Sequence, residues 1–240
     1  MRGRVTFLTL AAAMSALLLT AVPAGALTGG RIDGQAHPNV GLLVVDGSPA
    51  CSGVLVAPKV FVTAGHCGPD GVDVLVTLDS TLDGDLTLYS GALHVDPRFL
   101  SEKDDTHDLA VVTLDEAVPA TPAKLPGLGL LETLPAKTAL TAVGYGVHEL
   151  ANGGGRKRLA FDGARRNGTL GLKSLKDAEA SVAPLEAGLC FGDSGGPLLL
   201  GDTVVSLVSH GNKVCEGNSR TYRLDRANAR SFLSQFVTLP

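Results

Sequence analysis

Three segments of the sequence hold side chains that could act together in nucleophilic catalysis. Val62-Thr-Ala-Gly-His66-Cys67 presents a histidine, and His107-Asp108 places an aspartate before an apolar run. Cys190-Phe-Gly-Asp-Ser194-Gly-Gly-Pro197 holds a serine in a glycine-rich turn. A serine hydroxyl is a weak nucleophile at neutral pH, so it needs an adjacent base, and that base needs an orienting group. The chain order His66, Asp108, Ser194 supplies these three groups.

Each segment also has a structural interpretation when it is taken alone. A histidine before a cysteine can be structural, Asp108 could cap a strand while Asp104 and Asp105 compete for its role, and residues 192–196 could form an ordinary turn. The same residues fit the nucleophile elbow of α/β-hydrolases. That elbow requires a helix after the serine, whereas Pro197 and an apolar run follow here. The elbow is therefore disfavoured.

The elements that must position these residues are predicted to be short β-strands. Thirty glycines and thirteen prolines separate brief apolar or alternating runs, which is typical of strands joined by turns. The first set comprises residues 40–46, 51–57, 60–64, 72–78, 88–95 and 109–114. After a linker at residues 119–129, the second set comprises residues 139–145, 156–164, 180–183, 197–200, 204–210 and 221–224. Two antiparallel barrels or sandwiches are expected.

The C-terminal end is the part of the chain that is predicted to be helical. Asp225 is the expected N-cap of this helix. The apolar face would consist of Ala229, Phe232, Leu233 and Phe236.

Residues 1–26 have the pattern of a secretory signal. Arg2 and Arg4 precede an apolar stretch that ends in Ala24-Gly-Ala26, so we expect cleavage after Ala26 and a secreted, extracellular protein without membrane contact. The alternative is a membrane anchor, because the stretch is nearly long enough to span a bilayer. The net charge of −4, without a block of like charge, argues against nucleic-acid binding.

Four cysteines in an exported chain predict disulfides, and three pairings are possible. Pairing of nearest neighbours would join Cys51 to Cys67 and Cys190 to Cys215. The sequence has no C-x-x-C or clustered histidines, so no metal site is expected.

Taken together, the three segments resemble the trypsin/chymotrypsin family of serine proteases, from about Leu27 to the C-terminal helix. The resemblance implies an all-β fold of two six-stranded antiparallel β-barrels with the active site in the cleft between them. Residues 27–120 would form the first barrel, and residues 121–240 the second barrel with the helix. It further implies a monomeric endopeptidase that acts on proteins or peptides and needs no cofactor.

The resemblance also assigns roles to the three candidate catalytic residues. Ser194 would be the nucleophile, His66 the general base and then acid, and Asp108 the group that fixes the imidazole tautomer. Backbone N–H groups of Gly192 and Ser194 would form the oxyanion hole. Because the triad is intact, an inactive homologue acting as a binding protein is the less favoured alternative.

Substrate contacts are assigned in the same way. Ser209-His210-Gly211 would pair with the substrate backbone, with His210 in place of the usual tryptophan, and the disulfide Cys190–Cys215 would brace the specificity pocket. Gly188 would be the pocket floor, followed by Leu189, and a glycine floor cannot select Lys or Arg. Arg220 at a wall position resembles the acid-selective branch of the family, since a guanidinium binds carboxylates bidentately. If Arg220 instead points to solvent or pairs with Glu216, a medium apolar pocket remains.

Leu27-Thr-Gly-Gly30 resembles the free N-terminus of active family members, whose α-ammonium pairs with the aspartate before the nucleophile, here Asp193. Arg31-Ile32 is a competing start. Leu27 lies 24 residues before Cys51 and Ile32 only 19, short of the usual spacing. We therefore expect signal peptidase alone to create the active N-terminus, at Leu27.

Overall fold

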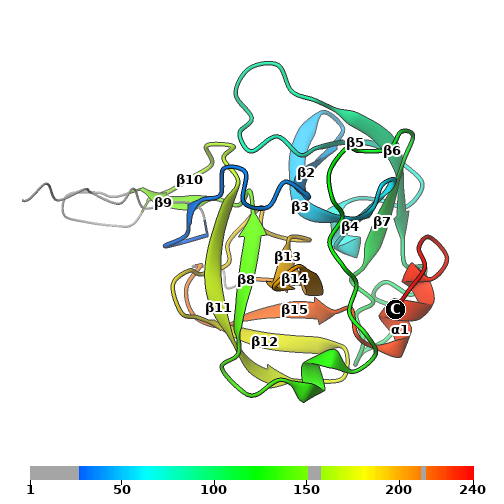
Figure 1. Ribbon diagram of the computed structural model, residues 1–240, viewed down its shortest axis with the longest axis vertical. Coiled ribbons are helices and arrows are strands. Elements are labelled where there is room, and N and C mark those ends of the chain that lie inside the picture. The colour runs from blue at the N-terminus through cyan, green and yellow to red at the C-terminus, as the bar shows by residue number, and fades with distance from the viewer. Residues whose placement is uncertain (1–26, 151–157, 212–214) are drawn as a thin grey trace, which may run out of the picture.

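The computed structural model describes residues 27–150, 158–211 and 215–240 (Figure 1). Six antiparallel strands close the first barrel in the order β2-β3-β4-β7-β6-β5. Their bounds are β2 Val40–Val45, β3 Ser48–Ala57, β4 Val60–Thr63, β5 Asp73–Thr77, β6 Tyr89–Val95 and β7 Ala110–Leu114. All six match strands that the sequence predicts, because each is a short apolar or alternating run whose buried side chains fill the barrel.

The second barrel closes because β11 and β13 both pair with β8. Its strands are β8 Ala139–Gly144, β11 Arg166–Leu175, β12 Glu179–Pro184, β15 Ser219–Arg223, β14 Thr203–His210 and β13 Pro197–Leu200. The short β1 (Arg31–Ile32) extends this sheet beside β11, while β9 (His148–Leu150) pairs with β10 (Arg158–Ala160). Two six-stranded antiparallel barrels confirm the predicted fold class.

One predicted barrel strand is wrong. Residues 156–164 lie partly outside the described residues, and the described part contributes only β10; the barrel strand is β11. Two glycines, Gly168 and Gly171, interrupt the apolar pattern of β11. Gly168 has a packing reason, since a Cβ there would lie 2.2 Å from the Cβ of Ala187.

The C-terminal helix α1 (Ala227–Leu233) is confirmed, and its buried residues are Ala229, Phe232 and Leu233. Its predicted N-cap is wrong, because Arg226 occupies the cap position. The buried Asp225 carboxylate instead accepts a hydrogen bond from the backbone N–H of Leu131 at 2.8 Å and pairs with Arg223 at 2.9 Å. Among the described residues, no helix is long and apolar enough to cross a membrane.

The two barrels share one hydrophobic cluster, to which α1 contributes. The stretch of residues 119–129, predicted as a linker, is hydrogen-bonded to both barrels as it crosses between them. Ala123 donates its N–H to the Leu55 carbonyl at 2.8 Å, and Lys124 donates to the Asp202 carbonyl at 2.9 Å. The crossing segment is therefore part of the packed structure.

Arg165 ties the second barrel to the first. Its buried guanidinium donates to the carbonyls of Val40 at 2.8 Å and Leu78 at 2.9 Å. Its Nε lies 2.8 Å from the carboxylate of Asp33, which is also buried. This ion pair holds the chain before the first barrel against the start of β11.

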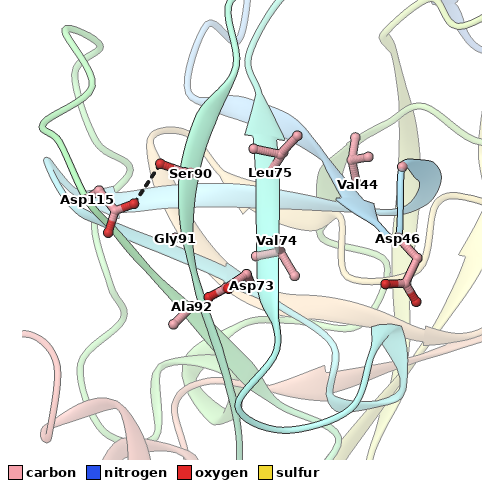
Figure 2. A pocket seen from close by; sticks show the side chains of 10 residues that line it. Val44, Asp46, Asp73, Val74, Leu75, Ser90, Gly91, Ala92 and Asp115 are labelled. Carbon is pink, nitrogen blue, oxygen red and sulfur yellow. Dashed lines mark hydrogen bonds between the residues drawn. The ribbon is translucent and has the colours of Figure 1, made fainter.

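A cavity of about 450 Å³ opens at the surface of the first barrel, where β2, β5 and β6 meet (Figure 2). Asp46, Asp73 and Asp115 lie along it, and Ser90 donates to Asp115 at 2.6 Å. None of the site residues predicted from the sequence lines this cavity.

Candidate active site

The three predicted catalytic side chains come from different elements and line one cavity of about 460 Å³. His66 lies in the 3₁₀ turn Gly65–Cys67 after β4, and Asp108 lies two residues before β7. Ser194 lies in the loop that leads from β12 to β13. The first barrel thus supplies the candidate base and its partner, and the second barrel supplies the candidate nucleophile.

Asp108 holds His66 at both its backbone and its ring. The backbone N–H of His66 donates to Oδ1 of Asp108 at 3.0 Å, and Nδ1 lies 2.9 Å from Oδ2. Asp108 is 1% exposed, whereas the His66 side chain is 34% exposed. With Nδ1–H on the carboxylate, Nε2 is left to accept a proton.

The Asp108 carboxylate has a third donor, the Ser209 hydroxyl, at 2.5 Å. Burial would raise the pKa of Asp108, but the hydrogen bonds from His66 and Ser209 and the charge interaction with His66 together lower that pKa from its ordinary value. Asp108 therefore stays ionised at neutral pH and can stabilise an imidazolium. The sequence assigned Ser209 only to the substrate backbone. No local pattern could have revealed a contact between residues 101 positions apart.

The disulfides lie beside the catalytic turns. Cys51 is bonded to Cys67, the residue after His66. Cys190, four residues before Ser194 in the loop between β12 and β13, is bonded to Cys215. The nearest-neighbour pairing is confirmed. Cys51, His66 and Cys67 lie within metal-ligand reach of one another, but both sulfurs are consumed by the disulfide, so this group does not suit an ion.

The nucleophile loop depends on glycines in a left-handed conformation. Gly192 has φ +90° and Gly195 φ +74°. A Cβ at Gly195 would lie 2.1 Å from Oγ1 of Thr63, and one at Gly192 would lie 2.9 Å from the Cα of Gly146. Only glycine fits both the torsion and the space.

The backbone N–H groups of Gly192 and Ser194 donate no hydrogen bond within the part of the chain that the structure describes. Their neighbours are engaged, since the N–H of Gly195 donates to the Val208 carbonyl at 2.7 Å and that of Asp193 to the Cys190 carbonyl at 3.2 Å. Two free N–H groups beside a candidate nucleophile are what an oxyanion hole requires.

The trypsin family model matches residues 28–228 of this chain. The chain belongs to the trypsin family. It is similar to human granzyme M, with 30% identity over 230 residues that cover 83% of this chain and 86% of the relative. Trypsin theta of Drosophila melanogaster is 30% identical over 200 residues, covering 73% and 72%. A trypsin of Saccharopolyspora erythraea is 29% identical over 196 residues, covering 74% and 82%.

In this trypsin-family chain, the segment predicted to begin the mature protein, Leu27–Gly30, lies against the second barrel. Leu27 is fully buried among apolar residues of the second barrel. Thr28 accepts a hydrogen bond from the N–H of Gly188 at 2.8 Å through its carbonyl, and its hydroxyl donates to the Cys215 carbonyl at 2.9 Å. The segment therefore contacts the residues predicted to form the specificity pocket.

Asp193 is buried at 1% exposure and accepts backbone hydrogen bonds from Gly146 at 3.0 Å and Cys190 at 2.9 Å. Burial raises the pKa of Asp193 to about 7, although both hydrogen bonds act in the opposite direction. Among the described residues no cation pairs with this carboxylate. Its ionised form therefore has no charge partner within the part of the chain that the structure describes.

The predicted pocket residues of this trypsin-family chain fall into two groups. Gly188 and Leu189 are buried, and a Cβ at Gly188 would lie 2.6 Å from Oγ1 of Thr28. Arg220 has a side chain 61% exposed and lies 3.8 Å from Glu179 of β12. Of the substrate-binding residues predicted, the cavity brings together Ser209, His210 and Gly211 with the triad. Residues 212–214 of the same region lie outside the described residues.

Proposed function

We propose that the chain is a secreted serine endopeptidase that hydrolyses proteins or peptides through an acyl-enzyme on Ser194. The observation that carries this proposal is the two-point grip of Asp108 on His66, in the same cavity as Ser194. With Nδ1 of His66 hydrogen-bonded to Asp108, the second ring nitrogen, Nε2, is left to exchange protons with the nucleophile.

In the first half of the reaction, Oγ of Ser194 attacks the substrate carbonyl carbon and its proton passes to Nε2 of His66. The carbonyl oxygen gains negative charge, which the N–H groups of Gly192 and Ser194 bind. His66 then gives the proton to the leaving amine as the C–N bond breaks. In the second half, a water attacks the acyl carbon, His66 takes one of its protons and returns it to Oγ, and the acid product leaves.

The specificity that we propose is for medium apolar residues before the scissile bond, and not for Lys or Arg. Gly188 supplies no charge for a basic side chain, and the Thr28 hydroxyl occupies the space beyond its Cα. Arg220 is exposed and paired with Glu179, which supports the apolar over the acidic preference. Phe99, Leu100 and Phe191 add apolar surface to the cavity.

The nucleophile assignment is tested by replacing Ser194 with alanine. Peptide hydrolysis should fall by about 10⁴–10⁶ in kcat, because one member of a catalytic unit is lost. Labelling by a fluorophosphonate probe should also disappear. The thermal unfolding midpoint should change little, since no core packing is removed.

The competing function is that of an inactive homologue acting as a binding protein. A parent protein that is folded but neither labelled nor active would refute the peptidase function and leave this alternative. Activity of S194A within tenfold of the parent would remove Ser194 from the mechanism.

A further inference from the structure

Ser52 of β3 contacts both residues whose N–H groups form the proposed oxyanion hole. Its hydroxyl donates to the carbonyl of Gly192 at 2.8 Å, and its backbone N–H donates to the carbonyl of Ser194 at 2.8 Å. These contacts join residues 140 or more positions apart and cross from the first barrel to the second.

The direction of the Ser52 hydroxyl is fixed. Its Oγ accepts the backbone N–H of Tyr145 at 2.9 Å, so its own proton is left for the Gly192 carbonyl. Ser52 is 0% exposed, so no water competes for either contact. A buried hydroxyl that both donates and accepts a hydrogen bond restrains its two partners, because breaking either bond would leave a buried polar group unsatisfied.

Gly192 needs such a restraint. Glycine adopts positive and negative φ about equally readily, so the loop could turn its N–H away from the substrate without a steric penalty. The N–H of Gly192 belongs to the Phe191–Gly192 peptide, whose carbonyl accepts the N–H of Val147 at 2.7 Å. The next peptide, Gly192–Asp193, is held by the Ser52 hydroxyl at its carbonyl and by the bond from the Asp193 N–H to the Cys190 carbonyl at 3.2 Å. Ser52 therefore restrains Gly192 from its C-terminal side, and both torsions of this glycine are limited.

We propose that Ser52 is a positioning residue that keeps the Gly192 N–H aimed at the developing oxyanion. This inference rests on the proposed peptidase function. Because Ser52 touches no substrate, its removal should weaken binding of the transition state and leave binding of the ground state unchanged.

The test compares S52A with S206A. Ser206 is also 0% exposed on a barrel strand, and within the described structure its hydroxyl has no hydrogen-bond partner, so S206A is the same chemical change without the contact. In S52A, kcat should fall by about tenfold with KM within twofold, less than the roughly 10²–10³ that loss of an oxyanion-hole donor costs. S206A should keep both constants.

Two inhibitors separate positioning from packing. A peptide aldehyde, whose adduct with Ser194 carries the oxyanion, should bind S52A weaker by the factor lost in kcat, whereas the matching product acid should bind equally well. Each rate is divided by the amount of Ser194 that the fluorophosphonate labels at completion. Partial unfolding of a variant therefore cannot be mistaken for a lower kcat. If S52A cannot be isolated, S52T, which keeps the hydroxyl, should retain aldehyde affinity better than S52V.

The inference is overturned if S52A matches S206A, if only KM changes, or if aldehyde and product affinities fall together. It is likewise overturned if S52T and S52V bind the aldehyde equally. A parent protein that neither hydrolyses peptides nor reacts with the fluorophosphonate would refute the proposed function instead.

Discussion

At the scale of single residues, two buried carboxylates show how surroundings decide a role. Asp108 and Asp193 are both 1% exposed. Hydrogen bonds from His66 and Ser209 outweigh burial and lower the pKa of Asp108, whereas only two backbone N–H groups oppose burial at Asp193, and its pKa rises to about 7. Asp108 is therefore ready to balance an imidazolium, and Asp193 is suited to receive a cation.

Substrate preference depends at this scale on Arg220. We expect kcat/KM to be higher for substrates ending in Leu, Met or Phe than for those ending in Asp, Glu or Lys, because the exposed guanidinium is paired with Glu179. R220G should leave that order unchanged. A preference for Asp or Glu that R220G abolishes would show that Arg220 enters the pocket, as in the acidic alternative. A preference for Lys would mean that the pocket residues are assigned wrongly.

At the scale of elements, local pattern predicted most strands but not their partners. The first-barrel strands follow apolar alternation, so they could be read directly. β11 could not be predicted in this way, because close packing against Ala187 requires glycine at position 168 and this breaks the apolar pattern. Asp225 was taken for a helix cap, because helix signals in the sequence do not reveal its ion pair with Arg223. The three candidate catalytic residues, which line one cavity, were identified from three sequence motifs. The hydrogen bonds that Ser52 donates to Gly192 and Ser209 donates to Asp108 were not predicted, because they depend on how the two barrels pack together.

We propose that chain processing controls activity through the segment Leu27–Gly30. We expect N-terminal sequencing of active protein to read Leu-Thr-Gly-Gly, with the new α-ammonium pairing with Asp193. A chain extended by several residues before Leu27 should have a kcat/KM lower by at least about tenfold, because no cation then reaches that carboxylate. Equal activity of both chains, or a start at Ile32, would refute this.

The same pair predicts a difference in pH dependence. In the extended chain, the pKa of Asp193 is raised to about 7, so ionising it costs folding free energy. The contribution of Asp193 to the unfolding free energy should be most favourable below about pH 4 and should be lost as the pH rises through 7. In the Leu27 chain the ammonium should offset this loss until it deprotonates, which the carboxylate of Asp193 should shift above the ordinary α-amino pKa of about 8. Denaturant titrations across this range would measure the difference.

At the scale of the whole molecule, the barrels are joined by a buried ionic network centred on Asp33. His37 and Asn167 also contact its carboxylate, at 2.5 and 2.7 Å. Burial raises the pKa of Asp33, but hydrogen bonds from His37, Asn167 and Arg165 outweigh it and lower the pKa to about 2. Its ionised form therefore stabilises the fold at neutral pH.

This network gives a prediction about acid stability. The contribution of Asp33, roughly 2 kcal/mol from its pKa shift, should be present above about pH 4 and lost as the pH falls toward 2. D33N should lower the unfolding free energy at pH 7 by about 3–5 kcal/mol, because Arg165 is left buried without its counter-charge. D202N breaks the exposed pair with Lys124 and should change little. Similar losses in both variants would contradict a special role for the buried network.

Each of the two disulfides closes within a single barrel, so neither would bridge the two pieces of a chain cut between β7 and β8. A single cut there would leave two fragments, each with its cystine intact. One fragment would carry His66 and Asp108, and the other Ser194. The nicked molecule would then behave as a heterodimer, whose activity falls on dilution even under non-reducing conditions.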